Sequence, residues 1–281
     1  MKLARSDARF PPRLKAIFDP PQSLYLRGSG EPELLGRRSV GVVGARSCSP
    51  YGAQVARMLG RELAAAGLVV VSGLARGIDG EAHRGALECG GPTVGVLGCG
   101  IDRDYPAANA SLSRRMEDGG LVISEYEAGV EPAPWRFPAR NRIIAGLCEA
   151  VVVVEARERS GALITADFAL EEGREVFAVP GEITSALSVG SNALLRLGAT
   201  PLTGSGDVLD ALGIERLAAA EDPDVSEAAR RVLGLVRDVP SGADELVARA
   251  SLEAGAVSVA LTELELAGLV AGADGVYRAV R

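Results

Sequence analysis

The stretch SVGVVG (residues 39–44) is a short apolar run that ends in glycine, and a longer segment of helical period follows it. The same succession repeats along the chain, with further apolar runs at 68–74, 92–98, 121–126, 150–156, 175–181 and, more weakly, 199–202. Segments of helix length alternate with these runs, at Tyr51–Ala66, Ile78–Cys89, Ala107–Asp118, Ala139–Glu149, Ala162–Glu172 and Ser188–Leu197. Runs that are apolar on both faces are typical of parallel strands covered by helices on both sides. The sequence therefore predicts an α/β fold with a doubly wound, Rossmann-like, mostly parallel sheet.

The regions outside this alternation predict three further parts of the chain. Residues 1–38 are expected to form an N-terminal extension that packs on the core, and residues 39–213 to form the Rossmann-like domain. Residues 214–226 read as a polar linker. In residues 227–281, three short helical patterns precede two β-like runs around Asp274-Gly275, an order that predicts a winged helix. The helical patterns are Glu227–Arg237, Ala243–Ala250 and Ala256–Ala267.

Composition excludes several classes of protein. Hydrophobic residues make up 47% of the 281 positions, enough to fill a core, but the longest apolar runs are far shorter than the ~20 residues of a membrane span, so we expect no membrane partner. The net charge of −7 argues at first against a polyanionic ligand. Residues 1–205, however, carry equal numbers of acidic and basic residues, so the acidic excess belongs to residues 206–281.

The residue types that support cofactor chemistry are scarce. His83 is the single histidine, and the two lysines, Lys2 and Lys15, precede the first strand of the predicted domain, which rules out a P-loop lysine. The turn at Gly98-x-Gly100 lacks the third glycine of a dinucleotide-binding motif. The four cysteines are too far apart for CxxC pairs and read as reduced thiols of a cytoplasmic protein. We therefore expect neither a metal nor a cofactor.

Glycine and arginine recur where the predicted strands end. Because the carboxyl ends of parallel strands meet at one edge of a sheet, where ligands bind, these turns are expected to lie together. In each turn alone, the glycine could serve only to form the turn and not to bind a ligand. Four of them, three with an arginine, favour an anion site. The turns are Gly44-Ala45-Arg46, Ser72-Gly73 with Arg76-Gly77, Gly98-x-Gly100, and Arg159-Ser160-Gly161.

A second cluster, Arg140-Asn141-Arg142, stands at the predicted start of a helix. Its arginines could clamp a phosphate or a base edge, or they could instead bind helix-end carbonyls or Glu155. Asp79 could pair with Glu125, although its position at the start of a helix favours an N-cap role.

Two other features favour structural roles. His83 has no second histidine or lysine nearby, which favours a structural role over a catalytic one. The predicted recognition segment of the winged helix, residues 253–267, contains three glutamates and no basic residue. Phosphates would repel such a helix, so we interpret the module as structural or protein-binding rather than as a DNA reader.

The order of motifs resembles that of the DprA/Smf family of DNA-processing proteins over about residues 10–212. One turn departs from the family pattern, because the usual Gly-Ser-Arg is Gly44-Ala45-Arg46 here, and Arg159 stands where the family often has lysine. The motifs that carry the resemblance include Ser49-Pro50-Tyr51-Gly52, Ser72-Gly73-x-Ala75-x-Gly77-Ile78-Asp79, Asp102-x-x-Tyr105-Pro106, Phe137-Pro138-x-Arg140-Asn141-Arg142, Ser160-Gly161-x-Leu163-Ile164-Thr165 and Gly190-x-Asn192.

The resemblance implies a protein that binds single-stranded DNA without cutting it. It further implies that the protein protects incoming DNA and helps to load the RecA recombinase during natural transformation, usually as a homodimer. The DNA-binding residues would then be those of the four turns together with Arg140, Asn141 and Arg142. Leu194, Leu195 and Leu202 are candidates for the dimer interface, although they could equally be core residues.

Single strands are held by cationic grooves with some stacking on aromatic side chains. The plausible stacking groups near the turns are few, namely Tyr51, Tyr105, Trp135 and Phe137, so binding should be mainly electrostatic. One alternative is a nucleotide-processing enzyme like the lysine-decarboxylase-like phosphoribohydrolases. Their catalytic glutamate loop would fall at Ser160–Thr165, which contains no glutamate. Another alternative is a protein adaptor without affinity for nucleic acid.

Overall fold

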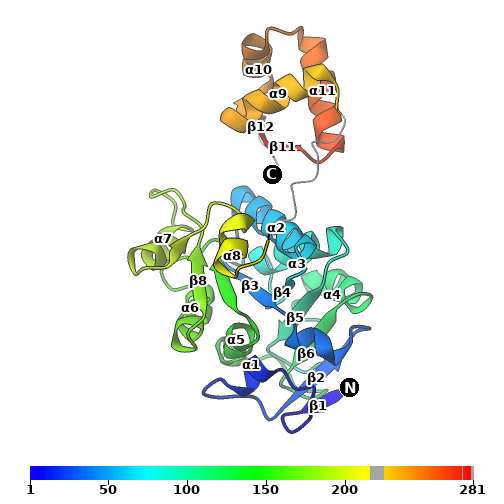
Figure 1. Ribbon diagram of the computed structural model, residues 1–281, viewed down its shortest axis with the longest axis vertical. Coiled ribbons are helices and arrows are strands. Elements are labelled where there is room, and N and C mark those ends of the chain that lie inside the picture. Colours follow the sequence, from blue (N-terminus) through cyan, green and yellow to red (C-terminus); the bar gives the residue numbers. More distant parts are fainter. Residues whose placement is uncertain (216–224, 274, 280–281) are drawn as a thin grey trace. The chain divides into compact units, whose positions relative to one another are not determined.

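The computed structural model describes residues 1–215, 225–273 and 275–279, and the chain divides into two units, Met1–Arg216 and Leu217–Arg281. The first unit contains the large sheet and the second contains a small helical fold (Figure 1). Most of the predicted linker, at residues 216–224, lies outside the described residues.

The first unit is built on one mostly parallel sheet, as the sequence predicts. The pairings β1–β2 and β2–β6 are antiparallel, and the six other pairings are parallel. The described strands, from one edge of the sheet to the other, are β1 (Lys2–Ala4), β2 (Ser23–Arg27), β6 (Leu121–Ser124), β5 (Thr93–Leu97), β4 (Val69–Ser72), β3 (Ser39–Val43), β7 (Ala150–Val153), β8 (Glu175–Ala178) and β9 (Thr200–Pro201).

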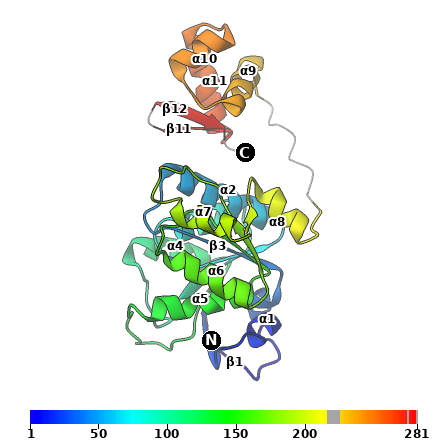
Figure 2. The same ribbon diagram turned by 90° about the vertical axis from the view of Figure 1, so that its left-hand side faces the viewer.

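Helices cover both faces of this sheet (Figures 1 and 2). On one face lie α1 (Pro12–Lys15), α5 (Arg136–Leu147), α6 (Gly161–Glu171) and α7 (Val189–Arg196). On the other lie α2 (Pro50–Ala65), α3 (Ile78–Glu88), α4 (Ala110–Glu117) and α8 (Ser205–Ala211). Successive strand residues point to opposite faces, so Val42 packs in the α2–α3 core and Val43 in the α5–α6 core. This explains why the central strands are valine-rich without alternation.

The N-terminal residues extend the sheet, a feature that the sequence pattern does not reveal. Leu3 and Leu24 of β1 and β2 are fully buried, and Tyr25 pairs with Ser124 of β6 in antiparallel register. The 3₁₀ helix η1 (Pro32–Gly36) connects this part to β3, and a second one, η2 (Ala107–Asn109), precedes α4.

Strand order creates a crevice beside β3. The chain leaves β3 toward α2 on one face and leaves β7, its neighbour, toward α6 on the other. Loops that diverge to opposite faces leave a crevice at the carboxyl ends of the two strands, the usual place for a ligand in such sheets. The helix that precedes β7 begins three residues earlier than the pattern predicts, so Arg140 and Asn141 lie in the second turn of α5 rather than at its start.

The second unit is a winged helix, which confirms the predicted fold. It contains α9 (Glu227–Asp238), α10 (Ala243–Ala250), α11 (Ala254–Leu266) and a sheet of order β10 (Ser241–Gly242), β12 (Val276–Ala279), β11 (Val270–Ala273). Leu233, Leu246, Leu261 and Leu264 fill its core. Asp274, in the predicted hairpin turn, lies outside the described residues. None of the described helices combines the length and the hydrophobicity that a membrane-spanning segment needs.

Candidate nucleic-acid interface

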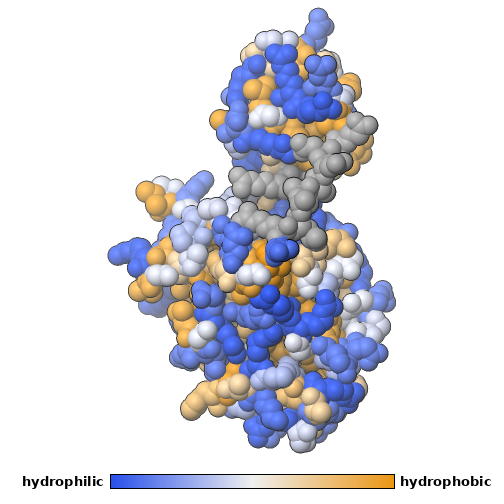
Figure 3. Space-filling view, viewed as in Figure 1, coloured by the Kyte–Doolittle hydropathy of each residue, from blue (hydrophilic) through white to orange (hydrophobic). Residues whose placement is uncertain are grey.

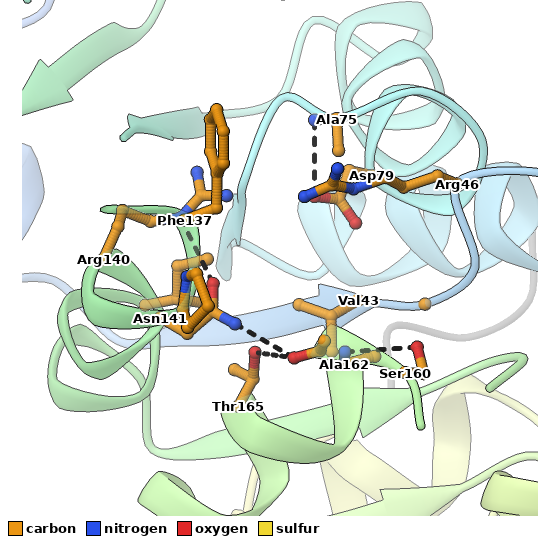
Figure 4. A pocket seen from close by; sticks show the side chains of 14 residues that line it. Val43, Arg46, Ala75, Asp79, Phe137, Arg140, Asn141, Ser160, Ala162 and Thr165 are labelled. Atoms are coloured by element: carbon orange, nitrogen blue, oxygen red, sulfur yellow. Dashed lines mark hydrogen bonds between the residues drawn. The ribbon is translucent and has the colours of Figure 1, made fainter. Parts of the chain in front are cut away.

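A pocket of about 190 Å³ opens at the crevice between β3 and β7 (Figure 4). Its walls come from the turns after β3 and β4, from α5 and from the start of α6. Predicted site residues in its lining are Gly44, Arg46, Arg140, Asn141, Ser160 and Gly161, and the other lining residues are Val43, Ala75, Asp79, Phe137, Pro138, Ile144, Ala162 and Thr165.

A second pocket, of about 230 Å³, adjoins the first. The two share Arg46, Ala75, Phe137 and Arg140, so they form neighbouring hollows along the carboxyl edge of the sheet. The residues that line only the second are Ser47, Gly73, Arg76, Leu97, Gly98, Tyr105 and Pro106. Nine of the predicted DNA-binding residues therefore line one pocket or both.

Free positive charge surrounds these pockets. Arg46 and Arg76 are exposed on the pocket walls, and Arg157 and Arg159 are exposed on the loop that leads to α6. Within residues 1–215, 225–273 and 275–279, no carboxylate forms an ion pair with any of these four arginines. Their charge is available to an anion.

Aromatic rings lie beside this charge. The rings of Tyr105 and Phe137 stack with centroids 5.2 Å apart, and the guanidinium carbon of Arg46 lies 5.4 Å from the Phe137 centroid. In Figure 4, Arg46 and Phe137 approach each other from opposite sides of the pocket. The predicted stacking residues Tyr105 and Phe137 thus belong to the pocket wall.

Arg140 is an anchor of the pocket rather than an exposed cation. It is buried, and its Nη1 donates to the carbonyl oxygens of Gly73 (2.8 Å) and Val96, while its Nε donates to Asn141 Oδ1 (3.3 Å). Burial lowers the pKa of Arg140 to about 10. The structure thus favours the carbonyl-binding role over the phosphate clamp.

Asp79 fixes the turn after β4 but does not cap α3, so the N-cap prediction is wrong. The N-cap is Gly77, and the Asp79 carboxylate accepts hydrogen bonds from the backbone N–H groups of Gly73 (3.1 Å) and Ala75 (3.4 Å). Burial raises the pKa of Asp79, opposed by the nearby charge of Arg140. Gly77 has φ +73°, and a Cβ there would lie 2.3 Å from the Ala45 carbonyl oxygen. The turn therefore requires glycine at this position.

The side-chain amide of Asn141 and the hydroxyl of Ser160 bind the start of α6. Asn141 Nδ2 donates to the Gly161 carbonyl oxygen (3.0 Å), and the Ser160 hydroxyl accepts from Ala162 N–H (3.3 Å) as the N-cap. The amino end of an eleven-residue helix therefore faces the first pocket, where its dipole favours negative charge.

Several predicted site residues lie outside the two pockets. Arg142 donates to Asp19 (2.9 Å) and to Glu125 (2.7 Å), so its charge is neutralised and Glu125 is not free to pair with Asp79. Gly100 bonds to the Val130 carbonyl (2.8 Å) in a neighbouring loop. The remaining ones are Ala45, Ser72, Gly77 and Arg159, of which Arg159 is exposed next to the pocket residue Ser160.

Glu155 is a buried residue with a role that the motifs do not predict. Its carboxylate accepts from Ser49 N–H (2.9 Å) and from the Ser49 hydroxyl (2.5 Å), at the start of α2. A Cβ at Gly52 would lie 2.4 Å from this carboxylate. Glu155 thus ties the loop that carries Arg46 to the end of β7. A charged residue that directly follows a buried valine run is the available sequence signal, since a buried carboxylate needs partners.

His83 is fully buried away from the pockets, with Nδ1 2.7 Å from the Thr93 hydroxyl. Burial lowers its pKa to about 3. Both observations agree with a structural role. Among the residues with described positions, no group of three or more histidine, cysteine or acidic side chains could hold a metal ion.

The candidate dimer residues divide between core and surface. Leu194 and Leu202 are buried within the unit, whereas Leu195 is half-buried and nearby Leu197 is 83% exposed. Hydrophobic residues protrude at α7 in the space-filling view (Figure 3). Leu194 and Leu202 therefore offer little surface to a partner.

Comparisons with known proteins identify both units. The family model described as DNA recombination-mediator protein A matches residues 2–213, and the one described as DprA winged helix domain matches residues 216–275. The chain is 47% identical to the DNA processing protein DprA of Streptococcus pneumoniae over 203 residues, which cover 72% of this chain and 71% of that protein. It is 40% identical to Protein Smf of Escherichia coli over 291 residues, which cover 99% of this chain and 77% of that protein.

Solved structures give the same result. The X-ray structure of DprA from Streptococcus pneumoniae matches with a TM-score of 0.71 at 45% identity, over 75% of this chain and 73% of that chain. DprA from Helicobacter pylori, a structure described for its single-stranded DNA binding mode, matches with a TM-score of 0.66 at 32% identity, over 72% of this chain and 92% of that chain.

Proposed function

The chain belongs to the DNA recombination-mediator protein A family, and from this we propose that it binds single-stranded DNA at the two pockets and does not cleave it. The observation that carries the proposal is the set of exposed, unpaired arginines around two adjacent hollows at one sheet edge. The DprA structure from Helicobacter pylori, described for its single-stranded DNA binding mode, supports the choice of ligand.

Phosphates would be bound by charge and by backbone dipoles. Arg46, Arg76 and Arg159 supply guanidinium groups, which suit the geometry of phosphate oxygens. The amino end of α6 at Gly161 supplies oriented N–H groups. The two pockets, of about 190 and 230 Å³, have room for part of a nucleotide each. The bases of a single strand are free to enter them, whereas those of a duplex are paired and stacked.

The acidic residue that lines the first pocket and the buried histidine outside it are both held by hydrogen bonds, which supports a binding role rather than a catalytic one. The carboxylate of Asp79 is already bonded to two backbone N–H groups, and buried His83 is bonded to Thr93. We therefore expect no nuclease activity and no release of base from nucleoside monophosphates. Release of a free base would instead favour the phosphoribohydrolase alternative.

We further propose that the protein acts in the cytoplasm as a homodimer, protects incoming single strands and helps to load RecA on them during natural transformation. These roles are inferred from the family. The exposed residues of α7, together with Leu197 directly after it, are the surface that we propose for the dimer contact in place of Leu194 and Leu202.

The test compares binding of the full chain to a single strand and to the matching duplex in a gel-shift titration at low salt. We expect tight binding of the single strand, protection of that strand from an added nuclease, and faster RecA filament assembly on it. Equal binding to both forms, or binding to neither, would contradict the proposal.

A further inference from the structure

Trp135, the single tryptophan of the chain, is 63% exposed at the N-cap position of α5. A tryptophan buries a large apolar area when it is covered, so one left open is a candidate contact for a ligand.

One cationic side chain, that of Arg136, contacts the rings of both Trp135 and Tyr126. The guanidinium carbon of Arg136 lies 4.9 Å from the centroid of the Trp135 ring and 5.0 Å from that of Tyr126. Its Nη1 donates to the Glu131 carbonyl oxygen, and its Nε is buried without a hydrogen-bond partner. We name these three residues, Tyr126, Trp135 and Arg136, the tryptophan platform.

The platform lies at the same sheet edge as the two pockets. Tyr126 follows β6, which pairs with β5 through Ser124 and Leu97, and Leu97 lines the second pocket. Phe137, two residues after Trp135, lines both pockets, and the Cα atoms of residues two apart are at most about 7 Å apart. The platform therefore continues the binding edge by one strand.

Charge on the platform is not cancelled by its neighbours. Glu125 bonds to Arg142 (2.7 Å) and Glu131 to Arg103 (2.5 Å), so both carboxylates already have cationic partners. Glu127 is the other acidic residue of this loop, and no described group forms an ion pair with it or with Arg136. Arg136 thus keeps its positive charge within about 5 Å of two aromatic rings.

We propose that the tryptophan platform binds a nucleobase of single-stranded DNA outside the two pockets. The inference rests on the proposed function and extends it, because it adds a base contact to a surface otherwise recognised by charge. Aromatic rings with arginine accept any base by stacking, so the contact would be tolerant of sequence. Tryptophan and arginine also occur in protein interfaces, but continuity with the pocket edge favours the nucleic acid.

The single tryptophan makes the contact directly measurable. The full chain is titrated with an oligothymidine and with an abasic oligonucleotide of equal phosphate number, while tryptophan fluorescence and gel retention are followed together. We expect the oligothymidine to quench Trp135, and the abasic strand to bind through its phosphates with little quenching.

Variants separate stacking from charge. Trp135→Ala should weaken binding of the oligothymidine roughly five- to hundredfold more than binding of the abasic strand, the range of one base stacked on an aromatic ring. Trp135→Phe should restore most of the loss, whereas Arg46→Ala should weaken both strands. Phe18→Ala is the matched control, because it removes a 98% exposed aromatic ring that is distant from the platform in the sequence. It should change the affinity for neither strand.

The possible failures are distinguishable. The inference is wrong if both strands are retained in the gel without any change in tryptophan fluorescence. It is also wrong if Trp135→Ala loses the same affinity for both strands. Either result leaves the proposed function standing. If Trp135→Ala alters RecA assembly and not DNA affinity, the platform is a protein contact and the inference is wrong. If neither strand is retained, the proposed function fails and the inference fails with it.

Discussion

Arg140 and Asp79 hold the same residue from two sides. Arg140 Nη1 donates to the carbonyl oxygen of Gly73 (2.8 Å), and Asp79 Oδ2 accepts from the N–H of Gly73 (3.1 Å). No ion pair within 4.0 Å joins the two side chains in the described structure, so the backbone of the turn links them in addition to the attraction of their charges. The turn after β4 is thereby fixed against α5, and the wall of the second pocket depends on both groups.

Gly73→Ala should disturb both anchors at once. A Cβ there would lie 2.5 Å from Arg140 Nη2 and 2.7 Å from Asp79 Oδ2, closer than atoms approach without a shift. Overpacking of this kind costs about 1–3 kcal/mol, and we expect a loss of unfolding free energy in that range together with weaker single-strand binding. Urea denaturation and gel-shift titration measure the two effects. Gly36→Ala, where a Cβ meets nothing within 4 Å, is the control.

Arg46→Ala should weaken single-strand binding by about 1–3 kcal/mol, the range of a charge-assisted contact. Arg46 is exposed, lines both pockets and has no carboxylate partner among the described residues, so its loss should not destabilise the fold. Arg114→Ala, at another exposed arginine that lines neither pocket, should bind like the parent. Unchanged affinity of Arg46→Ala at low salt would argue against the pockets as the DNA site.

Salt should weaken binding in proportion to the phosphates that are neutralised. For single strands the logarithm of affinity falls by about 0.7 per phosphate for each tenfold rise in salt. Removal of Arg46 should therefore make the slope shallower by about 0.7, and removal of Arg142, which is paired with Asp19 and Glu125, should leave it unchanged. Fluorescence-anisotropy titrations at several salt concentrations give these slopes. A flat dependence for the parent chain would contradict phosphate recognition.

The sequence predicts the sheet well because its signal is local. Runs such as SVGVVG need only their own residues to indicate a buried parallel strand, and glycine at their ends indicates the turns that meet at one edge. The strands β1 and β2 carry no comparable apolar run, since Lys2–Ala4 and Ser23–Arg27 are short and half-polar. Their place in the sheet comes from pairing, of β2 with β6 and of β1 with β2.

Roles of individual arginines are less predictable because their partners are distant in the chain. Arg140 donates to the carbonyl oxygens of Gly73 and Val96, and Arg142 donates to Asp19, which is 123 residues away in the sequence. Arg46 and Arg140 both follow an alanine in the sequence, yet Arg46 is exposed and Arg140 is buried. Spacing can indicate which turns meet, but it cannot indicate which guanidinium remains without a partner.

Acid should destabilise the fold through His83. The Thr93 hydroxyl donates to the Val70 carbonyl (2.8 Å), so it must accept from Nδ1–H of His83, which leaves Nε2 unprotonated and without a partner. The pKa of His83 is about 3 in the folded chain, against ~6.5 for an ordinary histidine. Between these values the unfolded chain binds a proton that the folded chain does not. Stability should therefore be fully present above pH ~6.5 and fall by about 1.4 kcal/mol per unit as pH decreases toward 3.

His83→Gln isolates this effect, because glutamine does not titrate while the carboxylates remain the same. The variant should be less stable than the parent at pH 7, where the Thr93 contact is lost, but the difference should shrink as the pH is lowered. Urea denaturation at pH 7, 6, 5 and 4 measures both chains. If the two lose stability in parallel over this range, the buried neutral histidine does not explain the acid sensitivity, because its contribution must vanish when the side chain can no longer take up a proton.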